Sequence, residues 1–253
     1  MNSKIQKFQK AGKLIQLWGN ISKGIKNLQL YRSYVKDPKR FIDPVQKTFD
    51  HYTSRFPVLQ TNYFPKVTRQ IPQSQWTMPK ITTGFTLDGS SGLYFNRTNK
   101  IKLNPYSWRY LKYAWESPKL AIQGMKNVAA HEAFHSIANQ SKMQLTKWSP
   151  KIGYYTARRG NPIYDELTYA FDSRKDSWTK SPEEFIADLS LARYDLGEKP
   201  GVGFSQWNPD NQRRTVNYLS QGFDFSPEDT EYLLHRFSQL GFKQGGKIEN
   251  PDH

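Results

Sequence analysis

The sequence predicts an α+β fold, in which a basic helical arm precedes a domain with a small antiparallel sheet and several helices. Three Ser-Pro pairs, of the kind that starts a helix, each open a long helical segment. Short strand-like runs lie between residues 82 and 103 and are separated by Asp-Gly and Asn-containing turns. With 253 residues, 15% of them aromatic, the chain can build a substantial core from few large side chains.

The first 36 residues form the predicted basic arm. Apolar side chains recur there at steps of three, four or seven residues, which indicates an amphipathic helix, and we expect it to break or bend near Gly19 and Gly24. The arm has eight basic residues and no acid before Asp37: Lys4, Lys7, Lys10, Lys13, Lys23, Lys26, Arg32 and Lys36. This charge favours attachment to nucleic acid, an anionic surface or an acidic protein. The alternative is a solvated basic face on a helix that packs on the domain.

Two Asp-Pro pairs mark the end of the arm. Asp37-Pro38 and Asp43-Pro44 indicate a turn-rich junction and a domain boundary. We therefore expect an arm over residues 1–45, a catalytic domain over residues 46–240 and a flexible Gly-rich tail over residues 241–253.

The small antiparallel sheet is expected after a proline-rich stretch. Prolines recur through residues 57–80, which predicts irregular chain laid over a surface. Residues 82–87 then run into Asp88-Gly89, a hairpin signal. Two further strands are expected at residues 92–95 and 100–103, joined by a short turn.

Three helices follow from the Ser-Pro pairs. Serine is a good N-cap, and proline fits the first helical position because its missing N–H would be unpaired there. The helices are expected from about residue 118 to 140, from 182 to 196 and from 227 to 240.

The composition excludes several kinds of site. The chain has no cysteine, which excludes disulfides, thiolate zinc sites and a cysteine nucleophile. No run approaches about 18 apolar residues, and the N-terminal region lacks the apolar segment of a secretory signal. We therefore expect a soluble, untargeted protein in which any metal ion is bound by histidines and carboxylates.

The motif that carries chemistry lies in the helix expected over residues 118–140. It reads His131-Glu132-Ala133-Phe134-His135, or His-Glu-x-x-His, with uncharged residues around both histidines. Residues i and i+4 of a helix lie on one face, about 5 to 6 Å apart, so both imidazoles can bind one Zn²⁺ ion. Glu132 can act on water beside that ion without being a ligand. The alternative is a pair of helix histidines that bind no metal.

A zinc peptidase needs a third protein ligand and one open coordination position. After His135 the next histidine is His235, so no nearby third histidine is present and a carboxylate is expected. The best candidate is Glu184, at the start of the second of the three helices, with Glu183 or Glu166 as alternatives.

The surroundings of Glu184 allow two interpretations. Asp188 lies four residues on, on the same helix face, and can accept a hydrogen bond from a ligand histidine. Residues 161–198 carry nine acids and four basic residues, a local charge that suits a cation. On the other hand, Ser181 and Glu184 form a Ser-x-x-Glu capping box, which would explain Glu184 without any metal.

Together the two motifs resemble those of zincin-like metallopeptidases of the gluzincin type, in the anthrax lethal factor-like group. The pattern is His-Glu-x-x-His followed downstream by Pro-Glu-Glu-Phe-Ile-Ala-Asp, and it covers about residues 80–196. The resemblance implies a zincin-like fold with Glu184 as the third zinc ligand and Asp188 as its neighbour. It also implies that the strand at residues 100–103 is the edge along which an extended peptide pairs.

The sequence departs from this family at two points. The family often has glycine before the second histidine, where this chain has Phe134. It also often has a tyrosine shortly before the third ligand to stabilise the oxyanion, which this chain lacks there. Tyr164, Tyr169 or His235 are the candidates for that role.

The resemblance implies a zinc-dependent endopeptidase that acts on a protein or peptide, with Glu132 as general base. Related domains occur in phage virion and toxin proteins, and the termini resemble those of structural proteins of crAss-like phages. We therefore expect a virion- or assembly-associated protein, located in the virion or the host cytoplasm. The alternative is a non-enzymatic virion or cargo protein with a degenerate zincin domain, whose residues 1–36 bind DNA or phage structural proteins. A secreted toxin or effector peptidase also fits the motif, but no export signal is visible.

Overall fold

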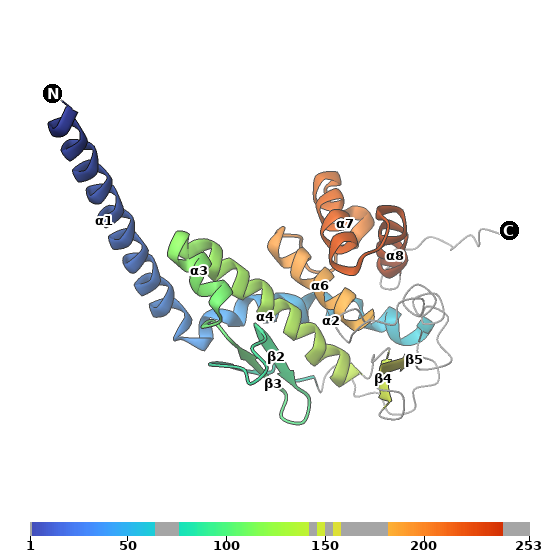
Figure 1. Cartoon of the computed structure of the whole chain (residues 1–253). Coiled ribbons are helices and arrows are strands. Elements are labelled where there is room, and N and C mark those ends of the chain that lie inside the picture. The colour runs from blue at the N-terminus through green and yellow to red at the C-terminus, as the bar shows by residue number, and fades with distance from the viewer. Residues whose placement is uncertain (1, 64–75, 142–145, 150–153, 158–181, 240–253) are drawn as a thin grey trace.

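The computed structural model describes residues 2–63, 76–141, 146–149, 154–157 and 182–239. It shows a mostly helical α+β fold, in which one long helix leads away from a body of helices and a small sheet (Figure 1). No helix among these residues is long and apolar enough to cross a membrane. The helices are α1 (Asn2–Val35), η1 (Pro38–Phe41), α2 (Ile42–Tyr63), α3 (Trp108–Glu116), α4 (Pro118–Ser141), α6 (Pro182–Asp195), η4 (Phe204–Gln206), α7 (Pro209–Phe223) and α8 (Pro227–Gln239). The strands are β1 (Lys80–Thr83), β2 (Gly92–Phe95), β3 (Lys100–Leu103), β4 (Thr146–Ser149) and β5 (Tyr154–Ala157).

The arm is one continuous helix, so the break expected near Gly19 or Gly24 is wrong. Gly24 instead permits a close contact, because an added Cβ atom would lie 2.2 Å from the ring of Trp115 on α3. One turn later, the Asn27 side chain donates to the carbonyls of Trp115 and Glu116 at 2.9 and 3.3 Å. It thereby pairs carbonyls at the end of α3, which would otherwise lack a partner.

The C-terminal end of α1 belongs to the main core. Tyr31 and Val35 are fully buried, and the Tyr31 hydroxyl donates to the carbonyl of Pro105 at 2.9 Å. Asp37 then caps η1 by accepting a hydrogen bond from the backbone N–H of Lys39 at 3.0 Å. The Asp-Pro turn expected at this point is therefore present.

Helix α2 extends further than the sequence suggested. It runs to Tyr63 and passes through Pro57, so the irregular chain expected over residues 57–80 is wrong for residues 57–63. Residues 64–75 lie outside the described part of the chain, and residues 76–79 have no regular secondary structure.

The three-stranded sheet is mixed rather than antiparallel. Strands β2 and β3 form the expected antiparallel pair, but β1 pairs in parallel with β3, giving the order β1-β3-β2. The connection between β1 and β2 crosses the end of β3, where buried Asn104 donates to the Thr86 hydroxyl at 3.1 Å and the Ser90 carbonyl at 3.2 Å. Strand β3 is therefore central, and its expected role as the edge strand is wrong.

The three helices that begin at Ser-Pro pairs are confirmed as α4, α6 and α8. At α8, the Ser226 hydroxyl accepts a hydrogen bond from the Asp229 N–H at 3.0 Å, as an N-cap should. Helix α7 was not expected, although Asn208-Pro209 starts it by the same chemistry. Helix α4 packs against α1, α2, α3, α6 and the sheet, which places it at the centre of the fold. The expected tail at residues 241–253 lies outside the described residues.

Replacement of two glycines of α1 tests how the arm is held. Gly24→Ala forces a methyl group against Trp115, and such overpacking typically lowers the free energy of unfolding by about 1–3 kcal/mol. The higher helix propensity of alanine offsets about 1 kcal/mol of this loss. We expect the free energy of unfolding, measured by urea denaturation, to fall by about 1 kcal/mol. The control is Gly19→Ala, whose Cβ meets no described atom within 4 Å and should be neutral or stabilising. Equal stability of the two variants would contradict the α1–α3 contact.

Candidate metal centre

Helix α6 lies antiparallel against α4, and a row of acidic side chains on α6 faces polar side chains on α4. Near one end of the contact, Asn127 of α4 donates to the carboxylate of Asp195 at 2.8 Å. Further along, the motif histidines of α4 face Asp188 and Glu184 of α6. The acids are spaced four and seven residues apart, which places them on one helix face. The pairing therefore sets the register of α6 on α4.

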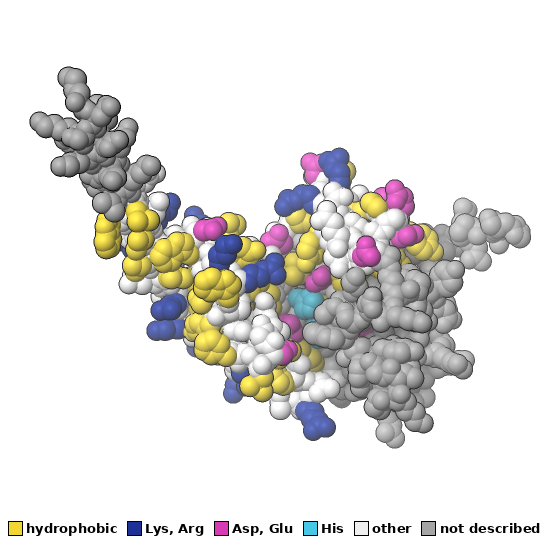
Figure 2. Space-filling view, in the orientation of Figure 1, with side chains coloured by type: hydrophobic (Ala, Val, Ile, Leu, Met, Phe, Trp, Pro, Cys, Tyr) yellow, Lys and Arg dark blue, Asp and Glu magenta, His cyan; other side chains and the backbone are white. Residues whose placement is uncertain are grey.

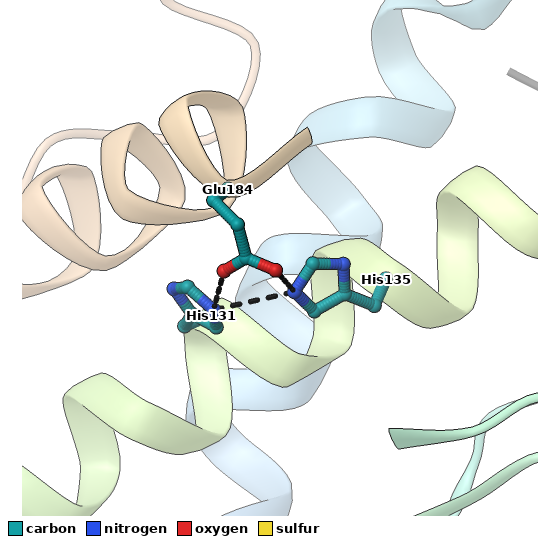
Figure 3. Close-up of side chains that lie close together, drawn as sticks. All are labelled: His131, His135 and Glu184. Atoms are coloured by element: carbon teal, nitrogen blue, oxygen red, sulfur yellow. Dashed lines mark hydrogen bonds and ion pairs between the residues drawn. The ribbon is translucent and has the colours of Figure 1, made fainter. Parts of the chain in front are cut away.

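His131, His135 and Glu184 converge on one point between these helices (Figure 3). The two histidine Nε2 atoms are 3.2 Å apart, and the Glu184 carboxylate oxygens lie 3.1 Å from Nε2 of His131 and 3.4 Å from Nε2 of His135. A tetrahedral ion with bonds of about 2.0–2.1 Å requires ligand atoms about 3.3 Å apart. The donor set and its spacing therefore fit a zinc ion.

The three side chains are partly buried, so they are held in place but remain accessible. Figure 2 shows histidine side chains at the surface of the described part, with acidic side chains nearby. The exposed fractions of the His131, His135 and Glu184 side chains are 17%, 20% and 21%, so a small ligand can reach the group from solvent.

Asp188 orients the imidazole of His131. Its carboxylate lies 2.8 Å from Nδ1 of His131, which leaves Nε2 directed at His135 and Glu184. Burial alone would lower the pKa of His131, but the carboxylates of Asp188 and Glu184 raise it well above its ordinary value. The site therefore favours positive charge at this position, whether a proton or a metal ion supplies it.

Glu184 is charged in this arrangement. Burial would raise the pKa of its carboxyl, but hydrogen bonds and charge interactions with His131 and His135 hold that pKa well below its usual range. Because each of its oxygens lies against an imidazole, the carboxylate faces the histidines, as a ligand would. The other residue of the possible capping box, Ser181, lies outside the described residues.

Glu132 is buried beside the histidines, at the contact between α4 and β2. Strand β2 begins there with Gly92, where an added Cβ atom would lie 2.6 Å from Val128 and 2.8 Å from the Glu132 carboxylate. Burial raises the pKa of Glu132, and the nearby His131 and His135 act in the opposite direction. The sequence analysis missed the need for Gly92, although an isolated glycine in a strand often marks close packing.

Tyr218 of α7 is a second residue that the sequence analysis missed. It is exposed and lies close enough to Asp188, the carboxylate that orients His131, to feel its charge. Burial and the charge of Asp188 raise the pKa of the Tyr218 hydroxyl, so it is a neutral donor near neutral pH. It lies on a separate helix and has no motif of its own, so only the fold reveals it.

The remaining residues considered from the sequence do not join the three-residue group. Glu183 lies on α6 but is not one of its members. His235 lies on α8, where its ring contacts Phe204 at a centroid distance of 5.4 Å and its Nε2 lies 3.7 Å from Glu231. Its role in stabilising an oxyanion stays a prediction. Three candidates lie outside the described residues: Tyr164, Glu166 and Tyr169.

Comparisons with models of protein families, with curated proteins and with solved structures found no match for this chain. The resemblance to zincins is therefore supported at the site alone, by a His-Glu-x-x-His helix and a glutamate from a second helix that together can hold a metal ion.

Metal analysis tests the site directly. Purified protein should bind about one zinc ion per chain, and His131→Ala, His135→Ala and Glu184→Gln should each abolish tight binding because each removes one of three ligands. Asp188→Asn should weaken affinity by about 10–100-fold, since it removes the hydrogen bond that orients His131. Affinity is measured by competition with a chromophoric chelator.

The matched control for these variants is Glu183→Gln, which changes a carboxylate beside Glu184 but outside the group. It should bind zinc like the unmodified protein. If this variant loses zinc while Glu184→Gln retains it, the assignment of the third ligand is wrong.

Proposed function

We propose that this protein is a zinc-dependent endopeptidase. The observation that carries the proposal is the convergence of His131, His135 and Glu184 at separations suited to one ion, with Glu132 beside them. Two imidazoles and one carboxylate form a ligand set typical of catalytic zinc, which keeps an open position for water or substrate.

Each residue of the site has a distinct task in this proposal. When bound, the zinc ion would polarise a carbonyl group and increase the acidity of water. Glu132 accepts the proton from the attacking water and delivers it to the leaving amine. Its buried position raises its pKa, which makes it a better proton acceptor than an exposed glutamate.

Asp188 and Tyr218 serve as positioning residues. Asp188 holds the imidazole of His131 through Nδ1, and Tyr218 lies near Asp188 on α7. The orientation of a ligand histidine by a carboxylate commonly strengthens metal binding.

Strand β2 provides the edge for an extended peptide substrate. Among the described residues it pairs only with β3, and it contacts α4 near Glu132. The Asn104 N–H donates to the Ser91 carbonyl at 2.8 Å, so the backbone groups of Ser91 point toward β3. In an antiparallel pair, the backbone groups of successive residues point alternately toward the partner strand and away from it. Those of Leu93 therefore point toward β3, and those of Gly92 and Tyr94 point outward. The Gly92 carbonyl already accepts from the Ser90 hydroxyl at 3.0 Å, and the Tyr94 N–H faces Glu132, so the Gly92 N–H and the Tyr94 carbonyl are the outward groups that can bind substrate backbone.

The biological setting of the proposal is a phage virion or its assembly, and it rests on the sequence resemblance alone. The rival is a non-enzymatic virion or cargo protein that keeps the same metal group. The two differ in one measurable property, which is cleavage of a peptide by the zinc-loaded protein.

The variant Glu132→Gln separates binding from catalysis. We expect it to retain zinc, because Glu132 is not a ligand, and to lose about 10²–10⁴-fold in kcat, because it cannot accept the proton. Cleavage is followed with unstructured protein substrates and mass spectrometry of the products. Glu183→Gln is the control and should cleave normally. A zinc-loaded wild type that cleaves nothing would favour the non-enzymatic rival.

Substrate pairing with β2 can be tested with N-methylated peptides. Methylation of a backbone N–H removes one hydrogen bond, so at positions that pair with the β2 edge it should lower kcat/KM by about tenfold. Because strand residues alternate in direction, the sensitive positions should be every second residue near the scissile bond. A uniform effect at all positions would contradict strand pairing.

A further inference from the structure

Helix α1 projects from the body of the molecule (Figure 1), and exposed apolar side chains lie along its projecting part. Leu17, Trp18 and Ile25 are 53%, 68% and 46% exposed, and Ile21 lies between them. At about 100° per residue, these four side chains fall within a sector of roughly 100°. We call these four residues the α1 stripe.

The α1 stripe continues a face that is buried elsewhere in the molecule. Val35 is fully buried in the core, and Leu17 lies about five turns earlier on the same face of the helix. Helix α3 covers that face only up to its end, where Asn27 caps it and Trp115 contacts Gly24. Leu17 and Trp18 are exposed N-terminal to this contact, and Ile25 is exposed beside it.

Basic side chains lie beside the α1 stripe, outside its sector. Lys23 and Lys26 are exposed on α1, and the helix sequence contains no acid. At the junction with the body, Leu120 at the start of α4 adds an exposed apolar side chain, and Lys119 adds an exposed basic one. Figure 2 shows apolar and basic side chains interspersed along this side of the molecule.

The charge and the arrangement restrict the partner. A second copy of the chain is disfavoured, because two helices with only positive charge repel each other when they pair. Single-stranded nucleic acid is typically bound by aromatic and basic side chains along one groove, whereas Trp18 lies in the apolar sector and Lys23 outside it. Contacts to the phosphates of a duplex would leave the apolar side chains of the α1 stripe exposed. Over residues 17–26, exposed Leu, Ile and Trp side chains lie on one side of α1, and Lys23 and Lys26 lie on the other. This arrangement suits the surface of a negatively charged bilayer.

We propose that α1 binds the surface of an anionic phospholipid bilayer through the α1 stripe. The helix lies in the plane of the interface, with Leu17, Trp18 and Ile25 among the acyl chains and Lys23 and Lys26 near the lipid phosphates. This proposal is independent of the metal centre, which lies between α4 and α6.

Vesicle flotation with the full chain tests the proposal. Vesicles of phosphatidylcholine mixed with phosphatidylglycerol should carry the protein, and vesicles of phosphatidylcholine alone should carry much less. Trp18→Gln combined with Ile25→Gln should reduce binding about tenfold or more, because both apolar contacts are removed. High salt should weaken binding, since the lysine contribution is screened.

The control replaces apolar residues elsewhere that are at least as exposed. Leu87→Gln combined with Tyr232→Gln changes a loop residue and a residue of α8, and it should bind vesicles like the unmodified protein. Equal loss in both double variants would overturn the assignment to α1. Absence of vesicle binding would overturn the proposal, whether the protein is retained by duplex or single-stranded DNA or by neither.

Discussion

The structure around the candidate site depends on the contact between α4 and α6, in which carboxylates of one helix face imidazoles of the other. His131 lies between two carboxylates, with Asp188 at Nδ1 and Glu184 at Nε2. Partly buried carboxylates are costly without a compensating positive charge. A proton on His131 supplies that charge in the metal-free chain, as its raised pKa indicates. A divalent ion supplies more charge at the same point, so the arrangement that orders the two helices is also the one that favours a metal ion.

The rest of the core holds these two helices at the required distance. The α4 helix carries small buried side chains, including Ala129, Ala130 and Ala133, which allow its neighbours to approach closely. On α6, the guanidinium of buried Arg193 donates to the carbonyl of Lys47 on α2 at 3.2 Å. This hydrogen bond fixes the far end of α6 and thereby limits movement of Glu184 relative to α4.

The sequence alone was sufficient to predict the parts of the site that depend on the spacing of residues within one helix. Positions i and i+4 of a helix determine that His131 and His135 share a face, so the pair follows from five residues. Glu184 required a choice among several carboxylates, because residue type and a helix start do not reveal which elements meet in space. The sheet order was not predictable for the same reason. The order places β2, rather than β3, at the edge beside Glu132, and buried Asn104 at the end of β3 binds the loop between β1 and β2.

Gly24 shows the same limit and also links the basic arm to the helices around the candidate site. In the sequence it resembles a helix break, because glycine weakens a helix, but in the fold it receives Trp115 of α3. Helix α3 leads directly into α4, which carries the histidines of the candidate metal centre. The basic arm is therefore joined through packed helices to the element that holds the site.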